Sequence, residues 1–300
     1  MKLDKLSWSD LVREAQEKQL PLADYLLERS AAQAEVEPAQ LLEEMAARLK
    51  VMEDAVAFGL TGVRSNSGLT GGSAKKMAAY ENAQKEQKSS GLLGPVAGSA
   101  VIYALAAAEA NGAMGRIVAA PTAGASGILP GILLALREHC QVEDAVLLEG
   151  LLVAGTIGEV IANRAMLSGA TGGCQAECGS GAAMAAGAAV HILGGSGAQI
   201  DTAIAIVFKN MLGLVCDPVA GLVEVPCIKR NAGSVVQCLL AAEMALAGIE
   251  SFIPADEAID AMGQVGRSLP HGLRETAEGG MALTPTALAW AKTYFEGMKK

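Results

Sequence analysis

Apolar residues recur at helical spacing along most of this 300-residue chain. Near the N-terminus the spacing predicts amphipathic helices over residues 7–18, 21–34 and 38–58. Further along, the same spacing predicts helices over residues 73–88, 96–110, 128–140, 142–166, 179–192, 200–211, 233–246 and 255–265. No segment shows the alternation with a period of two that marks a strand. The pattern therefore predicts a mainly α protein.

The density of charge changes sharply near residue 60. Residues 1–60 hold nineteen charged residues, whereas the next 190 residues hold twenty-five. We interpret residues 1–60 as an amphipathic helical segment and residues 61–300 as the main domain. The segment carries an apolar stripe that must be buried against another surface. We expect that surface to belong either to this domain or to a partner. The stripe includes Leu41, Leu42, Met45, Leu49 and Met52.

Two glycine-rich stretches interrupt the helical pattern. Residues 61–72 read TGVRSNSGLTGG and residues 120–127 read APTAGASG, and neither has an apolar period. Such composition is typical of loops, which often carry functional residues. We expect the first stretch to be a loop and the second to be either an extended loop or the end of a strand.

The charge and hydropathy of the chain exclude two classes of partner. A net charge of −9 and a pI near 5.0 argue against nucleic acid, which needs clustered Lys and Arg. The uncharged stretches 117–136 and 178–200 are too rich in Gly, Ala and Pro for membrane spans. Residues 1–10 lack the apolar region of a secretory signal, so we expect a cytoplasmic location.

The six cysteines are not expected to form disulfides in that compartment. Ten residues, two of them prolines, lie between Cys216 and Cys227, so a loop would bring their thiolates together, and Cys174 follows two glycines. Clustered thiolates select zinc or iron–sulfur clusters, although plain burial is an equal alternative. Zinc is less favoured because no C-x-x-C pair is present. Cys140 and Cys238 lie in apolar helical runs, where we expect core packing.

Four sequence blocks resemble the iron–sulfur-dependent L-serine dehydratases. TGGCQAECGSG together with CDPVAGLVEVPCIKRN resembles the cluster-binding pattern of that family, and SNSGLTGGSAKKM and APTAGASGILPG match two further blocks. The resemblance covers roughly residues 45–290. It implies a catalytic α chain in which Cys174, Cys216 and Cys227 hold a [4Fe-4S] cluster with one open iron acting as a Lewis acid. Cys178, about one helical turn after Cys174, is not a ligand in that pattern.

The resemblance also implies a reaction and a partner. L-serine would lose its Cα proton and hydroxyl by β-elimination and give pyruvate and ammonia. Relatives have either an additional N-terminal domain or a separate β chain, so a β subunit is implied here. The substrate-binding candidates are Ser65, Ser67, Thr70, Gly71 and Gly72, with residues 121–127 as a second wall.

The general base is left open by the sequence. Candidates are Lys75, Glu177 and His271, and Lys76 and Asp217 also lie in or near the matched blocks. We expect no pyridoxal phosphate, because the open iron already supplies the electrophile.

Two alternative functions share the cluster. A cysteine desulfidase would eliminate sulfide and would need a similar open iron. A non-enzymatic iron–sulfur protein would follow if a fourth cysteine closed the cluster.

Overall fold

The computed structural model describes residues 5–89 and 91–298. The first four residues of the N-terminal stretch discussed above lie outside this description. In the described ranges the chain forms helices joined by loops, with isolated β-bridges at Arg64–Gly71 and Cys216–Arg274 in place of strands. The predicted mainly α class is confirmed.

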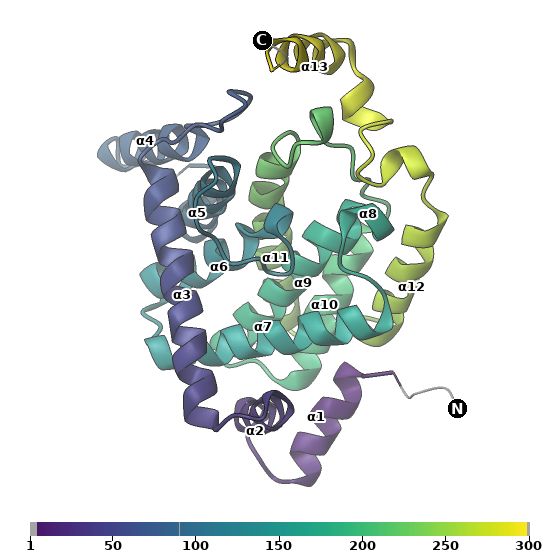
Figure 1. Ribbon diagram of the computed structural model, residues 1–300. Coiled ribbons are helices and arrows are strands. Elements are labelled where there is room, and N and C mark those ends of the chain that lie inside the picture. The colour runs from purple at the N-terminus through teal and green to yellow at the C-terminus, as the bar shows by residue number, and fades with distance from the viewer. Residues whose placement is uncertain (1–4, 90, 299–300) are drawn as a thin grey trace.

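The helices follow one another with short connections (Figure 1). They are α1 (Trp8–Glu17), α2 (Leu22–Ala34), α3 (Pro38–Leu60), α4 (Ser73–Glu86), α5 (Gly94–Gly112), α6 (Ile128–Cys140), α7 (Asp144–Arg164), α8 (Gly169–Gly172), α9 (Cys174–Ile192), α10 (Gly197–Met211), α11 (Cys227–Leu246), α12 (Ala255–Ser268) and α13 (Pro285–Gly297). Short 3-10 turns are η1 (Ala123–Ala125), η2 (Val219–Gly221), η3 (His271–Leu273) and η4 (Gly280–Leu283).

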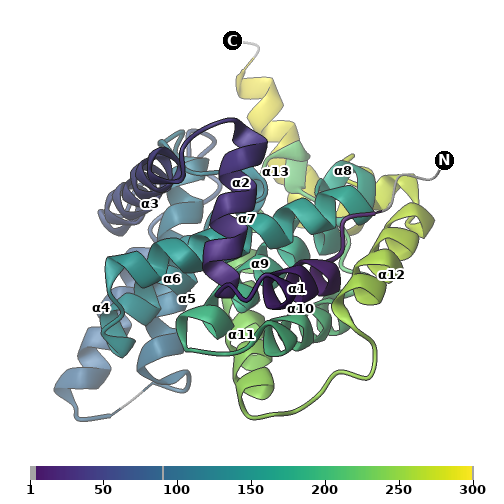
Figure 2. The ribbon, with the colours of Figure 1, turned by 90° about the horizontal axis from the view of Figure 1, so that it is seen from below.

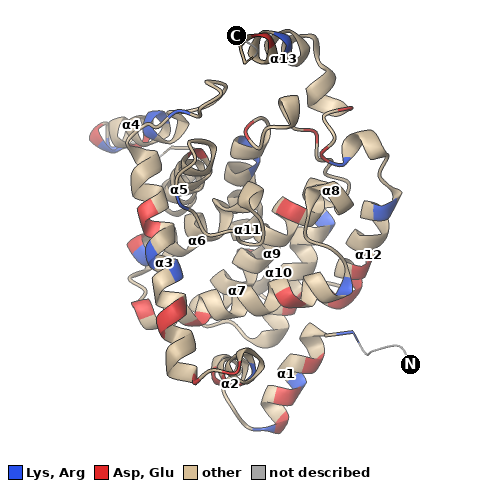
Figure 3. Ribbon diagram, viewed as in Figure 1, with Lys and Arg blue, Asp and Glu red and all other residues tan. Residues whose placement is uncertain are grey.

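Helix α9 is the centre of the fold. It packs against α6, α7, α10 and α11 (Figure 1), and all but one of its residues are buried. Most of those residues are Ala and Gly, which let neighbouring helices approach closely and fill the interior without aromatic side chains. Figure 3 shows Lys, Arg, Asp and Glu mainly on outer helices such as α1, α3 and α4.

The N-terminal helices lie against this body. Helix α3 packs on α5, and α1 and α2 contact α10 and α7, as the view from below shows (Figure 2). Met45, Leu49 and Met52 of the predicted apolar stripe are buried, whereas Leu41 and Leu42 are half-buried. Most of the stripe is therefore covered by the chain itself. The division into two domains at residue 60 stays a prediction.

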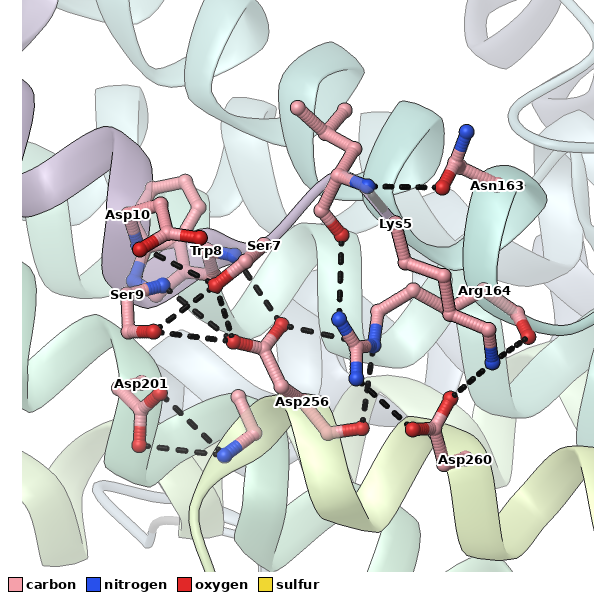
Figure 4. Close-up of polar contacts among 12 residues, drawn as sticks. Lys5, Ser7, Trp8, Ser9, Asp10, Asn163, Arg164, Asp201, Asp256 and Asp260 are labelled. Carbon is pink, nitrogen blue, oxygen red and sulfur yellow. Dashed lines mark hydrogen bonds and ion pairs between the residues drawn. The ribbon is translucent and has the colours of Figure 1, made fainter. Parts of the chain in front are cut away.

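A polar network fastens α1 to the start of α12 (Figure 4). Asp256 accepts hydrogen bonds from the Ser7 hydroxyl at 2.7 Å and from the Trp8 backbone N–H at 3.0 Å. The Arg164 guanidinium donates to Asp260 at 2.7 Å. The Trp8 ring is fully buried, and its indole N–H reaches the carbonyl of Gly197. This network places the N-terminal segment on the body.

Three features of the fold differ from the sequence-based expectations. Helices α9 and α11 begin at Cys174 and Cys227, five and six residues before the predicted starts. Helix α13 was not predicted, although its Thr284 cap and the following proline are a helix-start signal. Cys140 is exposed, so its predicted core packing is wrong. It ends α6, beyond Leu136, the last buried residue of that helix.

The apolar stretches considered as membrane spans are parts of the core. Residues 117–136 comprise an irregular segment, η1 and the first part of α6, and residues 178–200 run through α9 into α10. Helix α7 is long and apolar enough to cross a membrane by length and composition, but 56% of its most apolar window is buried. Such burial is typical of a core helix.

Candidate functional site

Four buried cysteines from three segments meet at one end of α9. Cys174 is the first residue of α9 and Cys178 follows one turn later, while Cys227 is the first residue of α11 and Cys216 lies in the loop before η2. The Sγ atoms of Cys174 and Cys178 are 3.4 Å apart, and the Cys216 thiol also hydrogen bonds to Cys174. The three predicted ligands are thus brought together, with Cys178 beside them.

Hydrogen bonds between the thiols lower the pKa of one cysteine and raise the pKa of two others. Hydrogen bonds of Cys174 with Cys178 and Cys216, together with the Arg230 charge, hold the pKa of Cys174 well below its usual value. The same bonds to Cys174, together with burial, raise the pKa of Cys178 and of Cys216. Burial raises the pKa of Cys227 to about 12. The protein alone therefore favours one thiolate, at Cys174.

Arg230 is the cation that faces this group. It lies on the first turn of α11 and donates to the Val215 carbonyl at 2.7 Å and to Asp217 at 2.8 Å, besides its contact with Cys174. Asp217 also accepts a 2.7 Å hydrogen bond from the backbone N–H of Met281. Asp217, one of the base candidates, is therefore engaged in holding the loop that carries Cys216.

Glu177 is the base candidate that lies beside the cysteines. It is 6% exposed, and its carboxylate accepts a hydrogen bond from the Thr122 hydroxyl. A Cβ on Gly124 would stand 2.6 Å from its Oε1, so only glycine admits the carboxylate here. Burial raises the pKa of Glu177 to about 7, aided by the negative charges of Cys174 and Glu275 and opposed by Thr122 and Arg230.

Asn231 ties the second glycine-rich block to Cys227. Its side chain is fully buried and donates to the carbonyls of Gly124 at 2.6 Å and Cys227 at 2.9 Å. Its oxygen accepts from the N–H of Gly127 at 2.9 Å. One side chain thus fixes residues 121–127 against the start of α11.

The first glycine-rich block contacts the cysteine loop through Glu224. The hydroxyls of Ser67 and Thr70 each donate to this carboxylate at 2.7 Å, and Glu224 lies between Cys216 and Cys227 in sequence. Ser65 is buried and its hydroxyl accepts from the Thr70 N–H. The neighbouring Gly71 pairs with Arg64, and the N–H of Gly72 donates to the Val63 carbonyl. The block is therefore folded against the cysteine loop, and its contact with substrate stays a prediction.

The remaining base candidates point elsewhere. Lys75 and Lys76 are exposed on α4, and the Lys75 ammonium reaches the Thr61 carbonyl at 3.5 Å. His271 has a 75% exposed side chain that pairs with Glu278 at 3.4 Å. Within the described residues neither Lys75 nor His271 has a hydrogen bond or ion pair with the cysteine group.

The three predicted ligands have the chemistry that iron–sulfur clusters require. Within residues 5–89 and 91–298, no group of three or more His, Cys, Asp or Glu side chains is arranged to hold a single metal ion. Thiolates of a cluster bind separate iron atoms and need not converge on one point. Cys174, Cys216 and Cys227 supply the soft sulfur ligands that such clusters select. Gly169 keeps space open beside them, since a Cβ there would stand 2.7 Å from the Cys216 Sγ.

Several site residues were not singled out from the sequence. Arg230 and Asn231 follow Cys227 by three and four residues, so an earlier start for α11 would have placed all three on one helical face. Thr122 was included as part of the expected second wall, residues 121–127, whereas Glu224 lies in a matched block and had no assigned role. The one usable signal was the clustering of polar residues directly after Cys227.

Comparison with known proteins identifies the family. The model of the serine dehydratase alpha chain family matches residues 17–282. The chain is 48% identical over 288 residues to a probable L-serine dehydratase alpha chain of Bacillus subtilis, covering 96% of this chain and 94% of that one. It is 39% identical to the L-serine dehydratase alpha chain of Peptoniphilus asaccharolyticus, covering 92% of this chain and 94% of that one.

A longer relative matches in part. The L-serine dehydratase of Streptomyces coelicolor is 37% identical over 278 residues, which is 91% of this chain and 60% of that protein. The match to the family model and the identity to two alpha chains over nearly their full lengths agree with the cysteine site described above. This chain belongs to the serine dehydratase alpha chain family.

Proposed function

We propose that this chain is the catalytic α chain of an L-serine dehydratase, which converts L-serine to pyruvate and ammonia with the help of a [4Fe-4S] cluster. The observation that carries the proposal is the meeting of Cys174, Cys216 and Cys227, from three segments of the chain, beside the buried carboxylate of Glu177. The names of the relatives support the substrate.

Cys174, Cys216 and Cys227 would hold the cluster. Three thiolates would leave one iron without a protein ligand, and that iron would supply a Lewis acid for the oxygen atoms of the substrate. Arg230 offsets the negative charge of the thiolates and fixes the loop of Cys216 through its bonds to Val215 and Asp217.

Glu177 is the general base in this proposal. A base works best when its pKa lies near the working pH, and the burial that raises the pKa of Glu177 to about 7 provides this. Thr122 holds the carboxylate by a hydrogen bond and so orients it. Among the sequence candidates, Glu177 combines burial with a position next to the cysteines.

The reaction then proceeds as a β-elimination. Glu177 takes the Cα proton of L-serine, the electron pair of that C–H bond forms the Cα–Cβ double bond, and the Cβ–O bond breaks with its pair going to oxygen. The oxygen leaves as water after gaining a proton. The remaining aminoacrylate tautomerises to an imine, which water hydrolyses to pyruvate and ammonia. No step needs pyridoxal phosphate.

The two glycine-rich loops are the proposed walls of the substrate site. Ser65, Ser67, Thr70, Gly71 and Gly72 form the first, and residues 121–127 form the second. Glu224 and Asn231 connect these walls to the cysteine loop and to α11. The proposal assigns these two side chains a positioning role.

A separate β chain completes the enzyme in this proposal. The Streptomyces coelicolor relative carries much additional length in one chain, which supports the idea that a further unit works with the α chain. A cytoplasmic location suits the proposal, because reduced thiols are needed to hold the cluster.

The test is anaerobic turnover of L-serine. We expect the reconstituted chain to form pyruvate and ammonia in equal amounts, weakly alone and strongly with a β chain of the family. Air should abolish the activity, and ferrous iron with a reductant should restore it. Full activity after prolonged aeration and chelation of iron would contradict the cluster mechanism.

A further inference from the structure

The loop after η3 brings the carboxylate of Glu275 to the cysteine group. A Cβ placed on Gly169 would lie 3.3 Å from the Glu275 Oε2 and 2.7 Å from the Cys216 Sγ, so both atoms border the same small space. The charge of Glu275 also acts on Glu177 and on Cys216. Glu275 therefore faces the site that contains the proposed base.

Glu275 is held in place by backbone contacts with Cys216. Its N–H donates to the Cys216 carbonyl at 2.7 Å, and the Cys216 N–H donates to the Leu273 carbonyl at 2.9 Å. Its φ of 63° lies in the left-handed region, which a residue with a Cβ rarely occupies unless its surroundings hold it there. The carboxylate is thus presented from a fixed backbone.

The Glu275 carboxylate has no hydrogen-bond or ion-pair partner in the described part of the chain. Among residues 5–89 and 91–298 it makes no hydrogen bond and no ion pair, although Arg230 lies in the same site. Arg230 is engaged by Asp217, Val215 and Cys174. The nearby Glu278, in contrast, is exposed and pairs with His271. A half-buried carboxylate without a cation is a receptor for one.

L-serine brings a cation of the required kind. Its α-ammonium group needs an anionic partner once it leaves water, and hydrogen bonds between charged groups are the strong ones. Glu177 is poorly suited to bind it, because a bound ammonium would lower the pKa of this carboxylate and weaken it as a base. Glu275 is free for this role.

We propose that the Glu275 carboxylate binds the α-ammonium group of the substrate and so selects amino acids over 2-hydroxy acids. This inference rests on the proposed function and adds a specificity-determining residue to it. Loss of the carboxylate charge removes a charge-assisted hydrogen bond from the bound state, which weakens amino-acid binding by about 10- to 100-fold.

The experiment compares Glu275→Gln with the wild-type enzyme and with Glu278→Gln, a matched control on the same loop. Each anaerobic, cluster-loaded protein is assayed for iron content and for KM and kcat with L-serine. The absorption of the cluster is then titrated with L-serine and with L-glycerate, which carries a hydroxyl in place of the ammonium. This titration reports ligand binding at the cluster and is a readout besides the turnover rate.

We expect Glu275→Gln to keep its iron, to raise KM for L-serine about 10- to 100-fold, and to bind L-glycerate as well as the wild type does or better. Glu278→Gln should resemble the wild type throughout. Unchanged preference for L-serine over L-glycerate in Glu275→Gln would overturn the assignment, and so would equal losses for both ligands. Failure of the wild-type enzyme to turn over L-serine would instead contradict the proposed function.

Discussion

Two polar networks of this molecule differ in how fully their charged groups are paired. At the anchor of α1, Asp256 is bonded to Ser7 and the Trp8 backbone, and Asp260 is bonded to Arg164 (Figure 4). Both carboxylates are therefore paired with donors inside the protein. Such saturation is what a network that only fixes two helices requires.

The cysteine site leaves its charges unbalanced. Arg230 acts on Cys174, Cys227 and Glu177, and it is already paired with Asp217. Burial, and to a smaller extent the negative charges of Cys174 and Glu275, raise the pKa of Glu177 to about 7. A site that keeps unsatisfied groups has room for a ligand, and the comparison therefore separates the structural network from the functional one.

The sharpest way to break the comparison is to remove a thiolate. Cys216→Ser should abolish cluster iron and serine turnover together, because a hydroxyl is a poor ligand for iron in such clusters. Iron content, absorption and pyruvate formation are measured under anaerobic conditions. Cys238→Ala, a buried cysteine that contacts the Ala182 carbonyl outside the site, is the control and should keep both properties.

Cys178 sharpens the same test. It is as buried as Cys174 and lies 3.4 Å from it, yet we expect Cys178→Ala to retain the cluster and most of the turnover. Loss of the iron in this variant would favour a closed, four-thiolate cluster and the non-enzymatic alternative.

The next largest effect is expected at Glu177. Glu177→Gln should keep the iron and the KM for L-serine but lower kcat by about 10²- to 10⁴-fold, the range that general-base catalysis contributes. Glu149 is a half-buried residue bonded to His191, and Glu149→Gln is the control, which should keep its kcat. A Glu177→Gln enzyme with wild-type kcat would remove Glu177 from the mechanism.

At the anchor the comparison predicts lost stability without lost chemistry. Asp256→Ala should lower the free energy of unfolding by about 2–4 kcal/mol, because the N-terminus of α1 and Arg164 both lose a partner. Denaturant unfolding gives the change, and serine turnover should stay near the wild-type value. Asp10 forms an ion pair with Arg13 on the surface of the same helix. The control variant Asp10→Ala should therefore change the free energy of unfolding by less than about 1 kcal/mol. Equal losses from both variants would show that the Asp256 network is not special.

The smallest expected effect is a dependence of stability on pH. The pKa of Glu177 is raised from 4.5 to about 7 in the folded protein, so its ionised form favours unfolding. The free energy of unfolding of the cluster-free protein should therefore fall as pH rises from about 4.5 to 7 and then level off. This fall should be about 1–3 kcal/mol larger in the wild-type protein than in the Glu177→Gln variant. The same fall in both proteins would assign it to other groups.

Most helices could be predicted from the sequence, because the helical spacing of apolar residues can be read from one chain alone. It missed the true starts of α9 and α11, since Gly and Cys carry little helical signal and tertiary packing decides their conformation. The two starts matter most, because they place Cys174 and Cys227 at the N-termini of two helices that meet at the site.

The candidate site was predicted in part, through its resemblance to a family. The blocks predicted that Cys174, Cys216 and Cys227 would meet, and the structure brings them together. Glu275 escaped notice because its approach to Cys216 depends on a left-handed backbone and on pairing between segments about sixty residues apart. Neither property can be predicted from the spacing of residues along the sequence.

The pairing of Cys216 with the segment around Glu275 bears on how the enzyme is made. During synthesis Cys174, Cys216 and Cys227 leave the ribosome before residues 271–281, and N-terminal parts fold first. Until that later segment emerges, the edge of Cys216 that it covers is open to the cell. In this interval the backbone N–H and carbonyl of Cys216 lack the partners that Leu273 and Glu275 provide in the folded chain.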